Sequence, residues 1–254
     1  MASPNDYIAV FDSGVGGISV LRHLRRELPE ERFLYFGDSA NAPYGTRPLE
    51  EIRTLTVAAA DMLLGRNVKA LVVACNTATS AAISLLREKY PDRIIIGIEP
   101  ALKLAADRFP GGTVGVMATP ATLREEKFNR LMESCCGRCT TVKLPAPGLV
   151  ELVEKGLADS EESFALLKKL LGDWAGKLDA LVLGCTHYPF AAATLGKILP
   201  GTVLLDGGEG TARETKRRLS QAGLLGGGPS EVVFENSKAD PVLLDLCRNL
   251  LEKA

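Results

Sequence analysis

Two cysteines of this 254-residue chain lie in closely similar local sequences. Cys75 belongs to ALVVACNTATSAA (70–82) and Cys185 to ALVLGCTHYPFAA (180–192), and the two segments align without a gap at an offset of 110 positions. A thiol can remove or deliver a proton when its surroundings tune its pKa. Two thiols on opposite sides of a small substrate could therefore invert a tetrahedral carbon, because one removes a proton and the other delivers one to the opposite face.

The similarity between the two halves of the chain extends beyond the cysteines. IIIGIEP (94–100) aligns with LLDGGEG (204–210) at the same offset, and IAVFDSG (8–14) resembles VGVMATP (114–120). A gapless match across a strand, a turn and a helix start favours an internal duplication. Ligands of open α/β sheets bind beyond the carboxyl ends of the strands. Two facing halves would then place the cysteines on opposite walls of one cleft.

The polar residues after each cysteine allow two interpretations. Asn76 and Thr77 follow one apolar run, and Thr186 and His187 follow the other. Such residues can cap a helix, and a cysteine at the end of a buried strand is usually a small core residue. The same pattern is typical of a binding site, because a helix N-terminus binds carboxylates and favours a thiolate.

A glycine-rich turn supplies a third polar element. In FDSGVGG (11–17) an apolar run reaches Asp12 and Ser13 before the glycines. The segment lacks the GK[ST] of a phosphate-binding loop and spells GxGxxS where a dinucleotide fingerprint requires GxGxxG. Asp12 is therefore either a turn residue or a carboxylate that faces the same cleft as Cys75.

The elements that must position these residues alternate along the chain. Helical patterns such as 17–28 and 50–65 separate short apolar runs, which we expect to be strands: 7–11, 32–37, 70–75, 93–98, 113–118, 140–145, 180–185, 202–207 and 231–236. Continuous apolar strands that alternate with helices predict parallel sheets covered on both faces. The expected fold class is α/β, of doubly wound type.

Composition excludes several classes of function. The chain is 46% hydrophobic with a net charge of −1, which gives no sign of a nucleic-acid partner. It shows no signal peptide and no apolar run near the roughly 20 residues that span a bilayer. We therefore expect a soluble, cytoplasmic protein without a membrane partner. Its six cysteines are then expected to be free, catalytic or metal-binding rather than disulfide-bonded.

Taken together, six motifs carry a family resemblance. They are DSGVGG (12–17), GDSANAPYG (37–45), ACNTAT (74–79), GIEPA (97–101), LVEKG (152–156) and GCTHYP (184–189). In this order and spacing the chain resembles glutamate racemase, a family of the cofactor-independent aspartate/glutamate racemase superfamily. The resemblance implies an isomerase that interconverts L- and D-glutamate without pyridoxal phosphate, metal or nucleotide, supplies D-glutamate for peptidoglycan and forms a homodimer.

The resemblance also implies roles for single residues. Cys75 and Cys185 match the catalytic cysteines, which act on the D- and the L-enantiomer respectively. Asp12 matches the aspartate that assists the first thiol, His187 matches the histidine that assists the second, and Glu154 matches a glutamate also proposed to assist catalysis. The positions that match the family's substrate site are Asp12, Ser13, Pro43, Tyr44, Gly45, Cys75, Asn76, Thr77, Cys185, Thr186 and His187.

The family's fold predicts how the chain divides. It implies two pseudo-symmetric α/β domains with mainly parallel sheets and the active site in the cleft between them. Residues 1–98 and 209–254 are expected to form the first domain, which carries Asp12 and Cys75. Residues 99–208 are expected to form the second, which carries Cys185 and His187.

Some residues depart from the family pattern or lie outside it. Asn41 stands where many members have arginine, and we do not place it in the substrate site. Cys135, Cys136 and Cys139 match no family role. The CxxC spacing of the last two permits zinc or redox chemistry, but a single pair without a nearby histidine favours unpaired thiols and no metal. Of the remaining residues, Cys247 is expected in the core and His23 on a solvated helix face.

Two other functions remain open. An aspartate racemase would share the fold, although His187 is characteristic of glutamate racemases, where aspartate racemases tend to carry a glutamate. A non-catalytic amino-acid-binding protein would also have two lobes around a cleft, although binding alone requires neither Cys75 nor Cys185.

Overall fold

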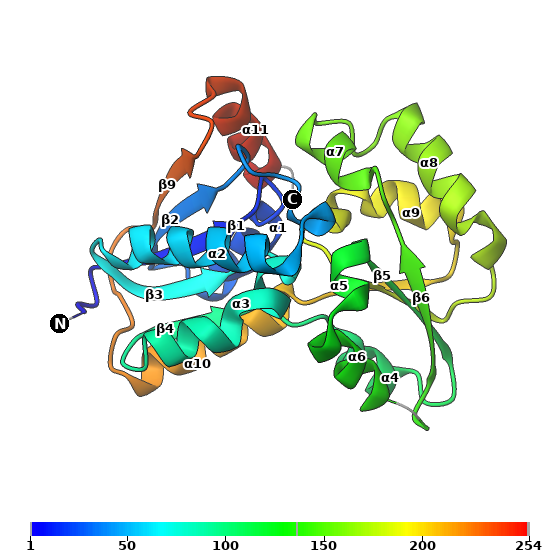
Figure 1. Ribbon diagram of the computed structural model, residues 1–254, viewed down its shortest axis with the longest axis horizontal. Helices are drawn as coiled ribbons and strands as arrows, with labels where there is room; N and C mark the ends of the chain where they lie inside the picture. Colours follow the sequence, from blue (N-terminus) through cyan, green and yellow to red (C-terminus); the bar gives the residue numbers. More distant parts are fainter. Residues whose placement is uncertain (1, 136, 253–254) are drawn as a thin grey trace.

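The computed structural model describes residues 2–135 and 137–252 and contains two parallel β-sheets flanked by helices (Figure 1). The first sheet has the order β4-β3-β1-β2-β9 and the second the order β6-β5-β7-β8, and every strand pair is parallel. The α/β fold class expected from the sequence is confirmed. The strands are β1 Tyr7–Asp12, β2 Arg32–Gly37, β3 Val68–Val73, β4 Ile94–Gly97, β5 Thr113–Ala118, β6 Thr140–Pro145, β7 Ala180–Leu183, β8 Val203–Asp206 and β9 Glu231–Asn236.

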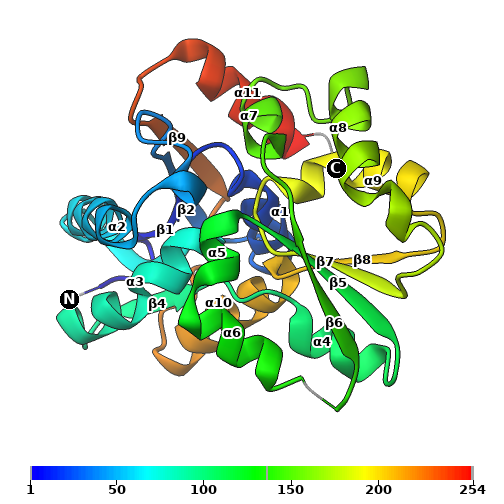
Figure 2. The ribbon, with the colours of Figure 1, turned by 45° about the vertical axis from the view of Figure 1, so that its right-hand side comes forward.

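Helices cover both faces of each sheet, as Figures 1 and 2 show. On the first sheet, α2 and α3 pack on one face, and α1, α10 and α11 pack on the other. The helices are α1 Ile18–Glu27, α2 Leu49–Leu64, α3 Asn76–Lys89, α4 Leu102–Arg108, α5 Pro120–Arg124, α6 Glu126–Glu133, α7 Leu149–Glu154, α8 Glu161–Leu171, α9 Ala192–Ile198, α10 Gly208–Gln221 and α11 Pro241–Glu252. Short 3₁₀ helices span Tyr44–Thr46, Gly172–Trp174 and Tyr188–Ala191.

The central strands are apolar on both sides because helices bury both faces of the sheet around them. Every residue of β3 is buried. Successive side chains of a strand point to opposite faces, so Phe11 packs with the α2–α3 side, whereas its neighbour Val10 packs with the α1–α10 side. The continuous apolar runs in the sequence therefore report two cores around one sheet, as is typical of parallel α/β folds.

The last part of the chain returns to the first sheet after the second sheet is complete. Strand β9 pairs with β2, and α10 packs against α1 and β4. We call the parts of the molecule around the first and second sheets the first and second lobe. The chain passes between them near Glu99 and near Gly207, and these two connections touch, because a Cβ atom at Gly207 would overlap the carbonyl oxygen of Glu99. The division of the chain into one domain of residues 1–98 with 209–254 and a second domain of residues 99–208 stays a prediction.

The expected solvation of His23 is confirmed only in part. Its side chain is half-buried, and Nε2 lies 3.7 Å from Oδ1 of Asp206, which follows from the packing of the second lobe connection against α1.

Cys247 is 1% exposed in α11, as expected for a core residue. Within the described part of the chain, no helix is both long enough and apolar enough to cross a membrane.

The two cysteine segments differ in local structure, although their sequences align. Helix α3 starts directly after Cys75, and the N–H of Thr79 donates to the Cys75 carbonyl as in any α-helix. The helix start expected directly after Cys185 is wrong. The residue four positions later is Pro189, which has no N–H to donate to the Cys185 carbonyl. The N–H of Tyr188 donates to the Cys185 carbonyl instead, and a 3₁₀ turn precedes α9.

A buried ion pair fixes the amino-terminal end of the first sheet. Lys69 of β3 pairs with Glu31, and the two side chains are 0% and 3% exposed. Lys69 also donates to the Pro4 carbonyl, and Glu31 accepts from the N–H of Gly226 at 2.7 Å. The pair therefore ties the first residues of the chain and the segment before β9 to the centre of the sheet.

Replacing one member of this pair should destabilise the fold. We expect Lys69→Met to lower the free energy of unfolding by about 3–5 kcal/mol, because it leaves the Glu31 carboxylate buried without a counter-charge. Lys89→Met removes the exposed Lys89–Asp61 pair and should cost less than about 1 kcal/mol. Urea denaturation of both variants measures the difference. Equal losses would contradict a structural role for the buried pair, and Lys69→Met combined with Glu31→Gln should recover part of the loss.

Candidate active site

The two cysteines that align in the sequence line one cavity between the sheets. Cys75 and Cys185 are 5% and 7% exposed, and the cavity has a volume of about 60 Å³. Most of the substrate-site residues expected from the sequence also line it, namely Ser13, Pro43, Tyr44, Gly45, Asn76, Thr77, Thr186 and His187. Asp12 and Glu154 do not line this cavity, and they contact its walls from behind.

Cys75 occupies the N-cap of α3. Its Sγ accepts a hydrogen bond from the N–H of Ala78 at 3.4 Å and lies 3.4 Å from Oγ of Ser13. Burial, reinforced by the charge of Asp12, raises the pKa of Cys75 to about 12, although both hydrogen bonds act in the opposite direction. In this state Cys75 holds its proton at neutral pH and is a potential proton donor.

Asp12 is the last residue of β1 and is fully buried. Its Oδ1 accepts from the N–H of Gly14, and its Oδ2 accepts from the hydroxyl of Thr186, both at 2.9 Å. Burial raises the pKa of this carboxyl group, and the charge of His187 and the two hydrogen bonds offset only part of the rise. A carboxyl group of the first lobe is therefore held by a hydroxyl of the second.

Cys185 lies beside an imidazole that is itself bound to a carboxylate. Its Sγ is 3.7 Å from Nδ1 of His187, and Nε2 of His187 is 2.6 Å from Oε1 of Glu154. Burial lowers the pKa of His187, but the hydrogen bonds and charges of Cys185 and Glu154 outweigh it and raise the pKa well above its ordinary value. The arrangement thus favours an imidazolium between a sulfur and a carboxylate.

Glu154, at the end of α7, connects this group to the first lobe. Its Oε1 also accepts from the N–H of Val15 at 2.7 Å. Burial raises the pKa of Glu154, but His187, Val15 and Ser39 more than compensate, so the net shift is downward. The glycines of DSGVGG permit this approach, because a Cβ atom at Gly14 would overlap Glu154 and one at Gly16 would overlap His187.

The sequence prediction missed Thr119, which lines the cavity from the N-cap of α5. Its hydroxyl lies 3.2 Å from that of Thr77 and 3.0 Å from that of Thr122, which links the two lobes across the cavity. A signal was present in the sequence, because the match between IAVFDSG and VGVMATP aligns Ser13 with Thr119. Other residues of the second lobe that line the cavity are Pro120, Ala146, Pro147, Gly148, Val150 and Glu151.

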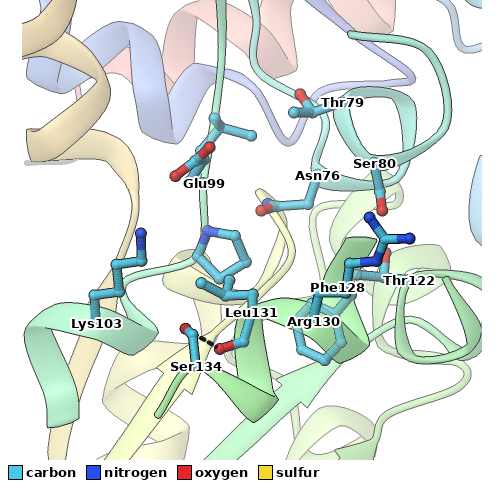
Figure 3. A pocket seen from close by; sticks show the side chains of 12 residues that line it. Asn76, Thr79, Ser80, Glu99, Lys103, Thr122, Phe128, Arg130, Leu131 and Ser134 are labelled. Atoms are coloured by element: carbon cyan, nitrogen blue, oxygen red, sulfur yellow. Dashed lines mark hydrogen bonds between the residues drawn. The ribbon is translucent and has the colours of Figure 1, made fainter. Parts of the chain in front are cut away.

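Asn76 separates the cavity from a second pocket of about 250 Å³. Figure 3 shows its amide oxygen directed into that second pocket, where Glu99 and Lys103 lie on the far side. The first N–H groups of α3, at Asn76 and Thr77, have no intrahelical acceptor. These backbone donors, rather than the amide of Asn76, are available to a ligand in the cavity.

The remaining sequence predictions concern metals and the loop after β2. Among residues 2–135 and 137–252, no group of three or more His, Cys, Asp or Glu side chains could hold a metal ion. Cys136, one of the two cysteines with CxxC spacing, lies outside the described residues. Cys135 is buried and free. The amide of Asn41 donates to both carboxylate oxygens of Asp38 and does not line the cavity.

Comparison with known proteins identifies the family. The sequence model of the Asp/Glu/Hydantoin racemase family matches residues 15–215. The glutamate racemase of Clostridium acetobutylicum is 47% identical over 255 residues, which cover 99% of this chain and 100% of the relative.

Solved structures give the same relationship. The glutamate racemase of Francisella tularensis in complex with D-glutamate has a TM-score of 0.85 at 28% identity, with 98% of this chain and 94% of the relative covered. The Escherichia coli glutamate racemase in complex with L-glutamate and the activator UDP-MurNAc-Ala has a TM-score of 0.84 at 31% identity, with 96% and 95% covered. The chain therefore belongs to the Asp/Glu/Hydantoin racemase family and, within it, to the glutamate racemases, which are isomerases.

Proposed function

We propose that this protein interconverts L- and D-glutamate by moving the α-proton between two thiols, without a cofactor. The observation that carries the proposal is that Cys75 and Cys185 line one cavity, each with a separate set of proton-binding neighbours. The relatives from F. tularensis and E. coli, solved with D- and L-glutamate respectively, support glutamate as the substrate. The sequence resemblance implies the same chemistry.

In the direction from L to D, Cys185 is the base and Cys75 is the acid. The sulfur of Cys185 removes the α-proton, and His187 with Glu154 balances the change in charge at that sulfur. The thiol of Cys75 holds its proton in the resting state and delivers it to the opposite face of the carbanion. After turnover the two cysteines have exchanged protonation states, so the protons must redistribute before the next L-glutamate reacts.

In the direction from D to L the roles are reversed. Cys75 must then be the thiolate and Cys185 the thiol, which is the state that an L-to-D turnover leaves, and the charge of Asp12 opposes the thiolate form of Cys75. Burial raises the pKa of Asp12 as well, so the negative charge of this carboxyl group is itself disfavoured beside the thiol. We propose that Asp12 assists the thiol of Cys75, as the family resemblance implies.

Substrate binding is assigned to groups that surround the two thiols. The N–H groups at the start of α3 suit a carboxylate, because the helix N-terminus carries a partial positive charge. The hydroxyl of Tyr44 already donates to Asp38 at 2.7 Å. Tyr44 and Gly45 are therefore proposed to contact the substrate through their backbone. The residues we propose to contact glutamate are Ser13, Pro43, Tyr44, Gly45, Cys75, Asn76, Thr77, Cys185, Thr186 and His187. Asp12, which the sequence resemblance also places in the substrate site, lies behind the cavity wall and acts through Thr186.

The wider setting forms part of the same proposal. We infer two domains, 1–98 with 209–254 and 99–208, and the membership of strands in the two sheets supports this division. The family resemblance supports a homodimer that works in the cytoplasm and supplies D-glutamate for peptidoglycan. The activator named for the E. coli relative, UDP-MurNAc-Ala, is consistent with that role.

Each of the two cysteines should be essential. We expect Cys75→Ala and Cys185→Ala each to lower racemisation by at least about a thousandfold, because each removes one of the two proton-transfer groups. The assay follows loss of the circular dichroism of L-glutamate and entry of deuterium at Cα in D₂O, after dialysis against a chelator. Cys247→Ala, which removes a buried thiol outside the cavity, should retain activity. Full activity in Cys75→Ala or Cys185→Ala would contradict the two-thiol mechanism. If the wild-type protein exchanges the α-proton of aspartate but not that of glutamate, the substrate is aspartate.

Replacing the carboxylate of Glu154 should weaken the Cys185 side and change its pH dependence. We expect Glu154→Gln to lower kcat roughly 10- to 100-fold, because His187 loses a charged hydrogen-bond partner. Glu162→Gln, an exposed carboxylate on α8, should leave kcat unchanged. Racemisation assays of the two variants across a range of pH provide the comparison.

The pH dependence of the stability of Glu154→Gln should show whether Glu154 raises the pKa of His187. In the folded protein the pKa of His187 is raised, so its imidazolium contributes stability below about pH 6.5, and this is lost as the pH rises through the folded pKa. Glu154→Gln lowers that folded pKa and should move the loss of stability to lower pH. Urea denaturation at several pH values measures it, and an unchanged pH profile would exclude Glu154 as the partner of His187.

A further inference from the structure

A chain of hydrogen bonds reaches the second oxygen of Glu154 from the far edge of the first sheet. The hydroxyl of Ser39 donates to Oε2 of Glu154 at 3.4 Å, and Nδ2 of Asn236 donates to Oγ of Ser39 at 2.9 Å. Ser39 follows β2 and is 3% exposed. Asn236 is the last residue of β9 and pairs in register with Gly37 of β2. Neither residue lines the cavity of the two cysteines.

The direction of these bonds is fixed by the surroundings of Asn236. Its Oδ1 accepts from the N–H of Lys238 at 3.0 Å, which turns the amide nitrogen toward Ser39. A hydroxyl carries one proton, and Asn236 fills an acceptor position on the oxygen of Ser39. The proton of Ser39 is therefore left for Glu154.

The two oxygens of Glu154 have different tasks. Oε1 receives the N–H of Val15 and faces His187, whereas Oε2 receives Ser39. Rotation about the last bond of a glutamate side chain is soft and roughly two-fold. A donor on Oε2 opposes this rotation and holds Oε1 in line with the imidazole ring.

We propose that Ser39 and Asn236 are positioning residues that hold the Glu154 carboxylate against His187 for proton transfer at Cys185. The inference rests on the proposed function and deepens it, because it adds the end of β9 to the groups that control one of the two thiols. Ser39 donates to the carboxylate, and Asn236 orients Ser39. The segment that returns to the first sheet last thus contributes to the chemistry of the second lobe.

Other groups around Glu154 must be taken into account in any pH experiment. His187 contacts it from the loop after β7, with Cys185 at the other ring nitrogen. Asp12 of β1, Tyr35 of β2 and Cys247 of α11 are close enough to interact with its charge. A neighbouring pocket, which Ser39 and Glu154 share, adds the charged side chains of Glu151, Lys155 and Lys238. The test variants leave all these groups in place.

The test compares Ser39→Ala and Asn236→Ala with Ser237→Ala. Ser237 accepts a hydrogen bond from the N–H of Ala40 at 2.8 Å, so its variant removes a bond between the same two loops without touching Glu154. We expect kcat to fall about tenfold in Ser39→Ala and about threefold in Asn236→Ala. KM should stay close to the wild-type value, and Ser237→Ala should behave as wild type.

The second readout is direct and does not require activity. The chain has only two histidines, so the side-chain ¹⁵N signals of His187 and His23 can be assigned with one variant of each. We expect the pKa of His187 to fall in Ser39→Ala and, less so, in Asn236→Ala, because the carboxylate is no longer held against the ring. His23, which pairs with Asp206, serves as the internal reference.

The outcomes separate this inference from the proposed function. An unchanged or raised pKa of His187 in Ser39→Ala would overturn the positioning role, and so would an equal fall in Ser237→Ala. Thermal denaturation of each variant checks that the fold is intact. If the wild-type protein does not racemise glutamate, the proposed function fails, while the histidine titration still decides whether Ser39 and Asn236 position Glu154.

Discussion

Two carboxyl groups beside the candidate site, those of Asp12 and Glu154, are each held in part by the opposite lobe of the molecule. Asp12 comes from the first sheet and accepts the hydroxyl of Thr186 from the second. Glu154 comes from the second lobe and accepts the N–H of Val15 from the first. A buried carboxylate is costly unless it is hydrogen-bonded, so neither group is satisfied by its own lobe alone. Closing the two lobes on each other therefore also sets the two groups that control the proton chemistry.

The glycine-rich turn between β1 and α1 contacts both Asp12 and Glu154, the two carboxyl groups that bridge the lobes. It supplies the N–H groups of Gly14 and Val15, and the hydroxyl of Tyr35 donates to the Gly14 carbonyl at 2.6 Å, which fixes the turn on β2. Gly16 leaves room for His187. Side chains at these glycines would push the second lobe away, so the turn acts as a contact surface between lobes and not as a phosphate-binding loop.

The two cysteines of the aligned segments have different surroundings because of a small local difference. After Cys75 the chain enters an α-helix, and a backbone N–H reaches the sulfur. After Cys185, Pro189 prevents the equivalent turn, and His187 takes the place beside the sulfur. One thiol is therefore surrounded by a helix start and a buried acid, and the other by an imidazole with its own carboxylate. Two unequal thiols suit a reaction in which one group must hold a proton while the other lacks one.

The parallel α/β fold and the paired cysteines could be predicted from the sequence because they depend on local patterns, and the family resemblance added most of the cavity wall. An apolar run, a polar turn and a helix start are contiguous in the chain, and the carboxyl ends of parallel strands meet at one edge. Which polar side chains become partners could not be predicted from the sequence, because the partners are far apart in the chain. Thr186 and Asp12 are 174 positions apart, and Asn236 and Ser39 are 197 apart. Such pairs depend on how sheets and lobes pack, and hydrophobic periodicity reports which faces are buried but not which polar atoms meet there.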